Sequence, residues 1–228
     1  LQQVGRTLVS DGAKELFKKL HDIDEIKGVK KPRNLKASLR PYQEAGFQWL
    51  SFLHEIGSGG VLADDMGLGK TIQTIALLLS VKANLKADGD KGSKMKALIV
   101  APTSVVTNWT RELDKFAPSL SYALWHGVDR QDRKEELDDA DIIIMSYALL
   151  RRDEEFLAKI PLKYAILDEA QNIKNPLSAT ARAAKRLKSD RRLALSGTPI
   201  ENRLSEIWST FDFVSPGLLG PLEKFEER

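Results

Sequence analysis

Five short apolar segments, each followed at once by polar residues, limit what this chain can fold into more than any other feature. Runs of Val, Ile and Leu without polar alternation are typical of strands buried on both faces. Helical periodicity lies between them, and strands that alternate with helices favour an α/β fold with a mostly parallel sheet covered by helices on both faces. The segments are "GVLA" at 60–63, "ALIVA" at 97–101, "DIIIMS" at 141–146, "YAILD" at 164–168 and "LALSG" at 193–197.

Helices are expected around these strands. One begins at Pro41, since the missing N–H of a proline does no harm in a first turn. Residues 70–83 are apolar nearly all round, and residues 104–116 carry one apolar stripe. The "NP" pair at 175–176 is expected to cap a further helix, whose inward face would include Leu177.

The composition excludes several classes of protein. With 228 residues, 42% of them hydrophobic, the chain suits one large domain with a buried core. Its net charge of +3 does not by itself argue for nucleic acid, so any site for a polyanion must be a local patch. The absence of cysteine excludes a disulfide scaffold and a thiolate site, and the three scattered histidines argue against zinc.

The chain also lacks membrane and secretory signals. No apolar run reaches the length of about 18 residues that a membrane span needs, and the N-terminus has no continuous apolar segment. We therefore expect a soluble, monomeric, intracellular protein without a membrane partner. It would lie in the cytoplasm or nucleoid of a prokaryote, or in the nucleus of a eukaryote. We also expect the chain to begin and end inside a longer one.

The segment "DDMGLGKT" at 64–71 follows a predicted strand and opens an apolar helix, which is the context of a phosphate-binding loop. Asp64 stands where the general pattern has its first Gly. Two glycines would let backbone N–H groups face the phosphates, Lys70 would reach the β- and γ-phosphates, and Thr71 would ligate Mg²⁺. The alternative is a plain glycine turn ahead of a core helix. The predicted nucleotide contacts are Asp65, Met66, Gly67, Leu68, Gly69, Lys70 and Thr71.

The segment "YAILDEAQN" places two adjacent carboxylates at a strand end. Asp168 suits a metal-holding role, directly or through water, and Glu169 suits accepting a proton from an attacking water. One Asp is enough, because Mg²⁺ prefers few carboxylates together with phosphates and waters. Alone, this "DE" pair would be a weak signal. With Lys70 upstream, the three residues form the predicted catalytic set.

A Ser-Gly-Thr-Pro turn ends the last predicted strand and can be interpreted in two ways. It is either a plain connection to the next helix or part of a coupling device. In the second case, the hydroxyls of Ser196 and Thr198 would bond to the "DEAQ" segment and sense the γ-phosphate.

Six segments, in their order and spacing, resemble the helicase-type motifs of the Swi/Snf ATPase family within helicase superfamily two, especially its prokaryotic members. The resemblance covers roughly residues 35–220 and implies a RecA-like ATP-binding lobe at 37–215. Residues 1–36 would be a basic helical or linker segment, and residues 216–228 would begin an insertion or a linker to a second lobe. The segments are "LRPYQEAGFQWL", "LADDMGLGKTIQTIALL", "LIVAPTSVVTNW", "DIIIMSYALLRRD", "LDEAQNIKN" and "LSGTPIENRLSEIWSTFDFVSPGLLG".

This resemblance also implies roles for single residues. Gln43 matches the glutamine that reads adenine in such ATPases, and the loop and acid pair match the groups that bind phosphate, hold the metal and activate water. Gln171 stands where many members have His, which should alter coupling to DNA more than nucleotide binding. The residues expected to couple ATP to DNA are Gln171, Ser196 and Thr198.

Two further segments, "PTSVVTNW" and "MSYALLRR", match those that follow one strand of DNA in this family. They supply hydroxyls, backbone N–H groups and cations, all of which hold phosphates without reading bases. Each candidate alone could equally be a helix cap or a surface residue. The candidates are Thr103, Ser104, Asn108, Ser146, Tyr147, Arg151 and Arg152.

The function implied by the resemblance is ATP-driven translocation along the phosphate backbone of double-stranded DNA, without strand separation, to remodel protein–DNA complexes. Two lobes would close around ATP and Mg²⁺, and the second would supply arginines that stabilise the transition state. The first lobe alone should therefore hydrolyse ATP poorly. The alternatives are an RNA or DNA helicase of the same superfamily, a nucleotide-dependent binding module without turnover, and a P-loop kinase.

Overall fold

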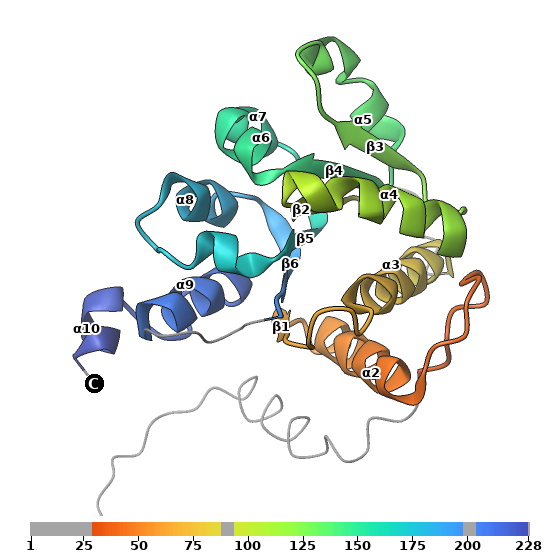
Figure 1. The fold of residues 1–228 in the computed structure, drawn as a ribbon, viewed down its shortest axis with the longest axis horizontal. Coiled ribbons are helices and arrows are strands. Elements are labelled where there is room, and N and C mark those ends of the chain that lie inside the picture. Colours follow the sequence, from red (N-terminus) through yellow and green to blue (C-terminus); the bar gives the residue numbers. More distant parts are fainter. Residues whose placement is uncertain (1–28, 88–93, 198–203, 228) are drawn as a thin grey trace, which may run out of the picture.

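The computed structural model describes residues 29–87, 94–197 and 204–227, and contains one six-stranded sheet (Figure 1). Every strand pair is parallel, and the strand order is β1-β6-β5-β2-β4-β3. The predicted α/β fold is confirmed, and each of the five predicted strands is present. The strands are β1 (Gly60–Leu62), β2 (Ala97–Ala101), β3 (Tyr122–Trp125), β4 (Ile142–Ser146), β5 (Leu162–Asp168) and β6 (Ser189–Leu195).

The sequence did not predict β3, which lies at an edge of the sheet and pairs with β4. Its residues alternate between half-buried and buried positions, with Ala123 and Trp125 facing inward. The half-buried Tyr122 and Leu124 pack on the opposite face of the sheet, so all four residues are apolar or aromatic. The run is short and contains neither Val nor Ile, so it differs from the Val-, Ile- and Leu-rich runs that identified the other five strands.

Helices cover both faces of the sheet (Figure 1), as predicted. Helices α2, α3 and α4 lie on one side, and α6 to α9 lie on the other. None of the helices in the described part of the chain is long and apolar enough to cross a membrane. The helices are α2 (Pro41–Glu55), α3 (Lys70–Ala87), α4 (Thr103–Phe116), α5 (Glu136–Asp139), α6 (Tyr147–Arg152), α7 (Glu154–Leu157), α8 (Ala179–Lys185), α9 (Leu204–Val214) and α10 (Leu222–Glu226), with 3₁₀ helices at Arg130–Arg133 and Ala170–Ile173.

The sheet separates two buried clusters, which explains the unbroken apolar runs. Along β2, Ala97 and Ile99 pack into the cluster beneath α3 and α4, while Leu98 and Val100 pack into the cluster beneath α6 and α8. Successive strand residues point to opposite faces. Because both faces of β2 are covered, every position in it must be apolar.

Helix α8 begins later than the sequence suggested. The side chain of Ser178 caps it, accepting a hydrogen bond from the backbone N–H of Ala181 at 3.1 Å. Asn175 instead closes a preceding turn, accepting from the N–H of Leu177 at 3.0 Å. The Leu177 side chain is 74% exposed, so the prediction that it faces inward was wrong. It lies before the first turn of the helix and therefore outside its apolar face.

Residues just outside the predicted lobe boundaries pack against the lobe. Leu35 belongs to the buried core, and the backbone N–H of Lys36 donates to the carbonyl of Phe116 at 2.8 Å. At the other end, Trp208 of α9 donates its indole N–H to the carbonyl of Gly220 at 2.9 Å, just before α10. The compact unit therefore extends to both sides of residues 37–215.

A buried ion pair stabilises the end of α6. Arg130 contacts both carboxylate oxygens of Asp153, at 2.7 and 2.9 Å, and the indole N–H of Trp125 donates to the same carboxylate at 2.7 Å. Both charged side chains are 5% exposed. The hydrogen bond from Arg130 is the main reason that the pKa of Asp153 lies below its ordinary value.

We expect Asp153→Asn to lower the free energy of unfolding by about 3 kcal/mol, because Arg130 would lose its countercharge while remaining buried. In the native protein, the lowered pKa gives a stabilisation that is fully present above the ordinary carboxyl pKa of about 4 and is lost as the pH falls through the lower folded value. Urea unfolding at pH 7 and at pH 3 measures both effects. Equal stabilities of variant and wild type at pH 7 would contradict this assignment.

Candidate nucleotide-binding site and DNA-facing surface

The predicted motifs converge on one edge of the sheet. Because every strand is parallel, the polar residues that follow the strands all lie at their carboxyl ends. Strand β6 lies between β1, which precedes the phosphate loop, and β5, which ends in the acid pair. The N–H of Ser196, just after β6, donates to the carbonyl of Leu62 at 3.1 Å. Three motifs far apart in sequence therefore lie side by side at this edge of the sheet.

The loop between β1 and α3 has the backbone of a phosphate-binding loop. Gly67 and Gly69 have φ angles of +82° and +83°, a region that residues with a Cβ rarely adopt. Lys70 begins α3 and is 9% exposed, and its ammonium donates to the carbonyls of Asp64 and Asp65 at 2.8 and 3.1 Å. The lysine is thus held directly over the loop, where it can exchange neutral carbonyls for phosphate oxygens. Met66 and Leu68 project outward, with exposures of 77% and 37%.

Asp64, the residue that departs from the general pattern, has a structural contact. Its carboxylate accepts a hydrogen bond from the side-chain amide of Gln73 at 2.9 Å. Gln73 is fully buried in α3 and lies against Gly46 of α2, where a Cβ would come within 1.8 Å of its amide oxygen. Sequence analysis missed Gln73, although a polar residue in an otherwise apolar helix was the available signal. Asp64 therefore ties the start of the loop to the helix that follows it.

Gln43 lies beside the loop, as the adenine-reading role requires. Its amide N–H donates to the carbonyl of Leu68 at 3.2 Å, and its amide oxygen accepts from the backbone N–H of Arg40 at 3.0 Å. A Cβ at Gly69 would lie 2.5 Å from the Gln43 amide nitrogen, so the close approach depends on glycine there. The adenine contact itself stays a prediction.

The first acid of the pair is buried and held from two sides. Asp168 is 6% exposed; the indole N–H of Trp109 donates to its Oδ2 at 2.8 Å, and the N–H of Glu169 donates to its Oδ1 at 2.9 Å. Burial raises the pKa of Asp168, and the bond from Trp109 opposes that rise. In the sequence, Trp109 was only one member of an apolar stripe, so its polar function was not foreseen.

Glu169 has a backbone conformation that is unusual for a residue with a side chain. Its φ of 51° lies in the left-handed region, where strain of about 1 kcal/mol is expected. The side-chain amide of Asn172 donates to the Glu169 carbonyl at 2.8 Å, and the Tyr147 hydroxyl donates to the Asp168 carbonyl at 2.7 Å. Strained backbone that surrounding contacts hold in place is a mark of functional sites.

A chain of side-chain hydrogen bonds joins this acid to the end of β6. Gln171 donates to the Glu169 carboxylate at 2.7 Å, and Ser196 donates to the Gln171 amide oxygen at 3.2 Å. The predicted contact between Ser196 and the "DEAQ" segment is therefore present. Thr198, the other predicted coupling residue, lies outside the described residues. The role of this chain in coupling remains a prediction.

The residues at this edge fit a magnesium nucleotide. Among residues 29–87, 94–197 and 204–227, no group of three or more His, Asp or Glu could form a metal cage. Mg²⁺ instead prefers one or two carboxylates together with phosphates and water, and Asp168 with the Thr71 hydroxyl matches that donor set. Asp168 accepts one described hydrogen bond at each oxygen, and a carboxylate has about four acceptor positions, so lone pairs remain for a metal.

The predicted DNA-facing residues fall into two groups. Five of them are exposed next to the same sheet edge, three near the start of α4 and two at the end of α6. Ser146, at the end of β4, is half-buried. Tyr147 differs, because it is 7% exposed and its hydroxyl is bonded to the acid corner. This geometry disagrees with a direct DNA contact for Tyr147. The exposed candidates are Thr103, Ser104, Asn108, Arg151 and Arg152.

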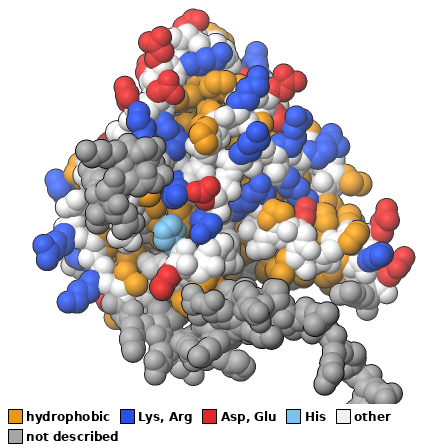
Figure 2. Space-filling view, turned by 180° about the vertical axis from the view of Figure 1, so that it is seen from behind, with side chains coloured by type: hydrophobic (Ala, Val, Ile, Leu, Met, Phe, Trp, Pro, Cys, Tyr) orange, Lys and Arg blue, Asp and Glu red, His pale blue; other side chains and the backbone are white. Residues whose placement is uncertain are grey.

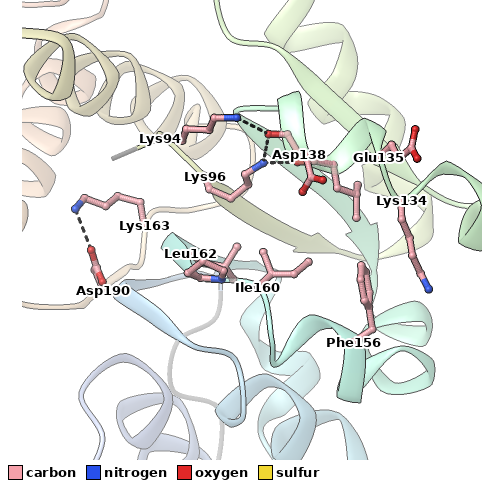
Figure 3. Close-up of a pocket in the computed structure, with 12 residues that line it drawn as sticks. Lys94, Lys96, Lys134, Glu135, Asp138, Phe156, Ile160, Leu162, Lys163 and Asp190 are labelled. Atoms are coloured by element: carbon pink, nitrogen blue, oxygen red, sulfur yellow. Dashed lines mark hydrogen bonds and ion pairs between the residues drawn. The ribbon is translucent and has the colours of Figure 1, made fainter. Parts of the chain in front are cut away.

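A cavity of about 730 Å³ lies at the opposite edge of the sheet (Figure 3). Its lining includes Lys96, immediately before β2, the first two residues of β5 and the second residue of β6, Asp190. Lys163 pairs with Asp190 at 2.9 Å, and Lys96 donates to the Asp138 carbonyl at 3.0 Å. These cations already have partners, and the cavity is remote from the phosphate loop. We therefore do not assign the nucleotide to it.

Known proteins resemble this chain over most of its length. The ATP-dependent helicase/translocase YwqA of Bacillus subtilis is 46% identical to this chain, over 96% of this chain and 24% of YwqA. The TATA-binding protein-associated factor MOT1 of Saccharomyces cerevisiae is 40% identical over 94% of this chain and 12% of MOT1. The chain thus spans a quarter or less of these relatives.

Solved structures give the same result. The Sulfolobus solfataricus SWI2/SNF2 ATPase core in complex with double-stranded DNA is 47% identical, with a TM-score of 0.77 over 87% of this chain and 40% of that one. The ATPase core domain from the same organism is 46% identical, with a TM-score of 0.74 over 87% of this chain and 39% of that one. The sheet described above is therefore the RecA-like fold of these cores. The model of the SNF2-related domain matches residues 42–228, and this chain belongs to the SNF2-related family.

Proposed function

We propose that this chain is the ATP-binding lobe of an ATP-dependent translocase that moves along double-stranded DNA and remodels protein–DNA complexes without separating the strands. The observation that carries this proposal is the convergence, at one sheet edge, of the phosphate loop, the Asp168–Glu169 pair and the exposed polar ends of α4 and α6. ATP chemistry and phosphate contacts can therefore act on one rigid unit.

ATP and Mg²⁺ are the proposed cofactors. Gln43 would contact adenine, the loop would bind the phosphates, and Thr71 with Asp168 would hold the metal, which would neutralise charge on the phosphates. Glu169 would orient and deprotonate the attacking water. We further propose that a second lobe supplies arginines to the transition state, that the protein acts as an intracellular monomer, and that this lobe alone turns over ATP slowly.

The proposal is supported by the polar groups at the motif edge rather than by the overall charge. The net charge is only +3, and the lysine and arginine side chains on the face shown in Figure 2 are not assigned to this edge. Exposed hydroxyls and the adjacent Arg151 and Arg152 add donors at the motif edge itself. Such groups hold phosphates without reading base sequence.

Nucleic-acid specificity tests the proposed function. The ATPase rate of the full-length protein should rise with duplex DNA much more than with single strands or RNA. A third strand in a DNA triplex should be displaced in an ATP-dependent manner, while a forked duplex should stay paired. Stimulation by RNA alone would support the helicase alternative. ATP binding without turnover under every condition would support the binding-module alternative.

We expect the double variant Arg151→Ala/Arg152→Ala to weaken duplex binding of the full-length protein and to reduce its salt dependence. Each phosphate contact that is lost should lower the slope of log affinity against log salt by about 0.9. Fluorescence anisotropy across a salt series measures this slope. Lys188→Ala is the matched control, since Lys188 is exposed just before β6 at the opposite sheet edge. An unchanged slope in the double variant would argue against these contacts.

A further inference from the structure

The two helices that carry the DNA-facing candidates both reach the acid pair through buried aromatic residues. On α4, Trp109 directly follows the exposed Asn108, yet its ring is fully buried and its indole N–H donates to Asp168 Oδ2 at 2.8 Å. A hydrogen bond to an ionised carboxylate is stronger and more directional than one between neutral groups. The position of α4 is therefore linked directly to the orientation of the Asp168 carboxylate.

Helix α6 makes the second contact. Tyr147 is its first residue, and the hydroxyl donates to the backbone carbonyl of Asp168 at 2.7 Å. The same helix ends in Arg151 and Arg152, both exposed. Trp109 thus holds the side chain of Asp168, and Tyr147 holds its backbone from a different helix.

The backbone between these two donors is the strained corner at Glu169. A left-handed residue persists only where neighbouring contacts determine its conformation. Here a displacement of α4 or α6 would change the hydrogen bonds that hold Asp168 and, through the next peptide, the direction of the Glu169 side chain. Buried hydrogen bonds of this kind transmit small displacements because the packed interior has little room to absorb them.

We propose that Trp109 and Tyr147 are positioning residues that hold the acid pair for hydrolysis and report to it the placement of α4 and α6 on DNA. This inference rests on the proposed function, because it assumes that those helices contact DNA. The two aromatic side chains would then do more than fill the core. Other residues contact the metal, the nucleotide and the DNA.

Trp109→Phe in the full-length protein tests the first contact, since it removes the N–H and keeps an aromatic ring. Changing a group that orients a metal ligand typically costs 10–100-fold in metal affinity or activity. We expect the DNA-stimulated ATPase rate to fall about tenfold, and the Mg²⁺ concentration that half-saturates binding of a non-hydrolysable ATP analogue to rise about tenfold. Equilibrium affinity for duplex DNA should change by less than about twofold, because the exposed face of α4 is kept.

Trp125→Phe is a closely matched control. Trp125 is also almost fully buried, and its indole N–H also donates to a buried aspartate, Asp153, at 2.7 Å. Its loss should lower the thermal unfolding temperature about as much as the loss of Trp109. However, the ratio of DNA-stimulated to basal ATPase rate and the Mg²⁺ half-saturation should stay at the wild-type values.

Tyr147→Phe tests the second contact and keeps the proposal testable if Trp109→Phe fails to fold. It removes a single hydroxyl, so the DNA-stimulated rate should fall about fivefold, as expected for one neutral hydrogen bond. Its Mg²⁺ half-saturation should change less than that of Trp109→Phe, because the carboxylate keeps its donor.

The outcomes separate this inference from the proposed function. If the wild-type ATPase rate does not respond to DNA, the proposed function fails. The positioning role of Trp109 is then tested by the Mg²⁺ half-saturation of ATP-analogue binding alone, and an unchanged value in Trp109→Phe overturns it. If wild type responds to DNA but Trp109→Phe and Tyr147→Phe keep both its stimulation ratio and its Mg²⁺ half-saturation, the positioning role is overturned while the proposed function stands.

Discussion

Lys70→Ala is expected to reduce ATP hydrolysis by the full-length protein at least about 100-fold, the size of effect found when one preorganised charge-stabilising donor is removed. The Lys70 ammonium lies over the phosphate loop, bonded to the carbonyls of Asp64 and Asp65, and Lys70 is only 9% exposed. There its charge is less screened than at the surface. Alanine leaves the charge that develops on the phosphates without this cation.

Steady-state ATPase assays with saturating duplex DNA measure the effect of Lys70→Ala. Lys82→Ala is the matched control on the same helix, since the Lys82 ammonium pairs with Asp141 at 2.6 Å, away from the loop. That control should lose some stability and keep its activity. Wild-type turnover in Lys70→Ala would show that the loop is misassigned.

Glu169→Gln is expected to separate binding from chemistry. The amide keeps the size of the side chain and its hydrogen bond to Gln171, but it cannot accept the proton of the attacking water. Removal of a general base typically costs 10²- to 10⁴-fold in rate, so we expect a fall of about 1,000-fold in turnover. ATP affinity should change by less than about threefold, because the lost interaction forms only in the transition state.

Single-turnover hydrolysis together with equilibrium binding of ATP tests this separation. Glu154→Gln provides the control, since Glu154 is a half-buried carboxylate on α7 that pairs with Arg186 at 2.6 Å, and Arg186 lies just before β6 at the opposite sheet edge. It should hydrolyse ATP within about threefold of wild type, as expected for a group that does not act in the transition state. Loss of ATP binding in Glu169→Gln would point instead to a structural role for the strained corner.

The sequence was sufficient for most of the fold because the signals were local. Continuous apolar runs identified the buried strands, and β2 was predicted with both of its ends correct. Strand β3 escaped because its run of four apolar or aromatic residues is short and contains neither Ile nor Val. The position of Leu177 was wrong because Ser178, three residues before the first buried helical residue Ala181, forms the cap instead. Such errors arise where two short polar residues compete for the same capping role.

The phosphate loop and the acid pair were also predictable, because the chemistry of phosphate and Mg²⁺ restricts the residue types that follow each strand. Gln73, Trp109 and the inward hydroxyl of Tyr147 were not. Gln, Trp and Tyr occur in helix cores and on surfaces alike, so their residue types alone did not predict hydrogen bonds to the site. Trp109 and Asp168 are 59 positions apart, and no local pattern joins them.

The sequence by itself determined which groups stand at the ends of the strands, since burial on both faces demands apolar residues within each strand and leaves the polar residues to follow it. Only the tertiary structure decided how those groups meet. The strand order puts β6 between the loop and the acid pair, which brings Ser196 to Gln171. The packing of α4 and α6 brings two aromatic donors onto Asp168. Hydrogen bonds depend on distance and direction at the ångström scale, and those are fixed by the packed sheet and helices rather than by neighbours along the chain.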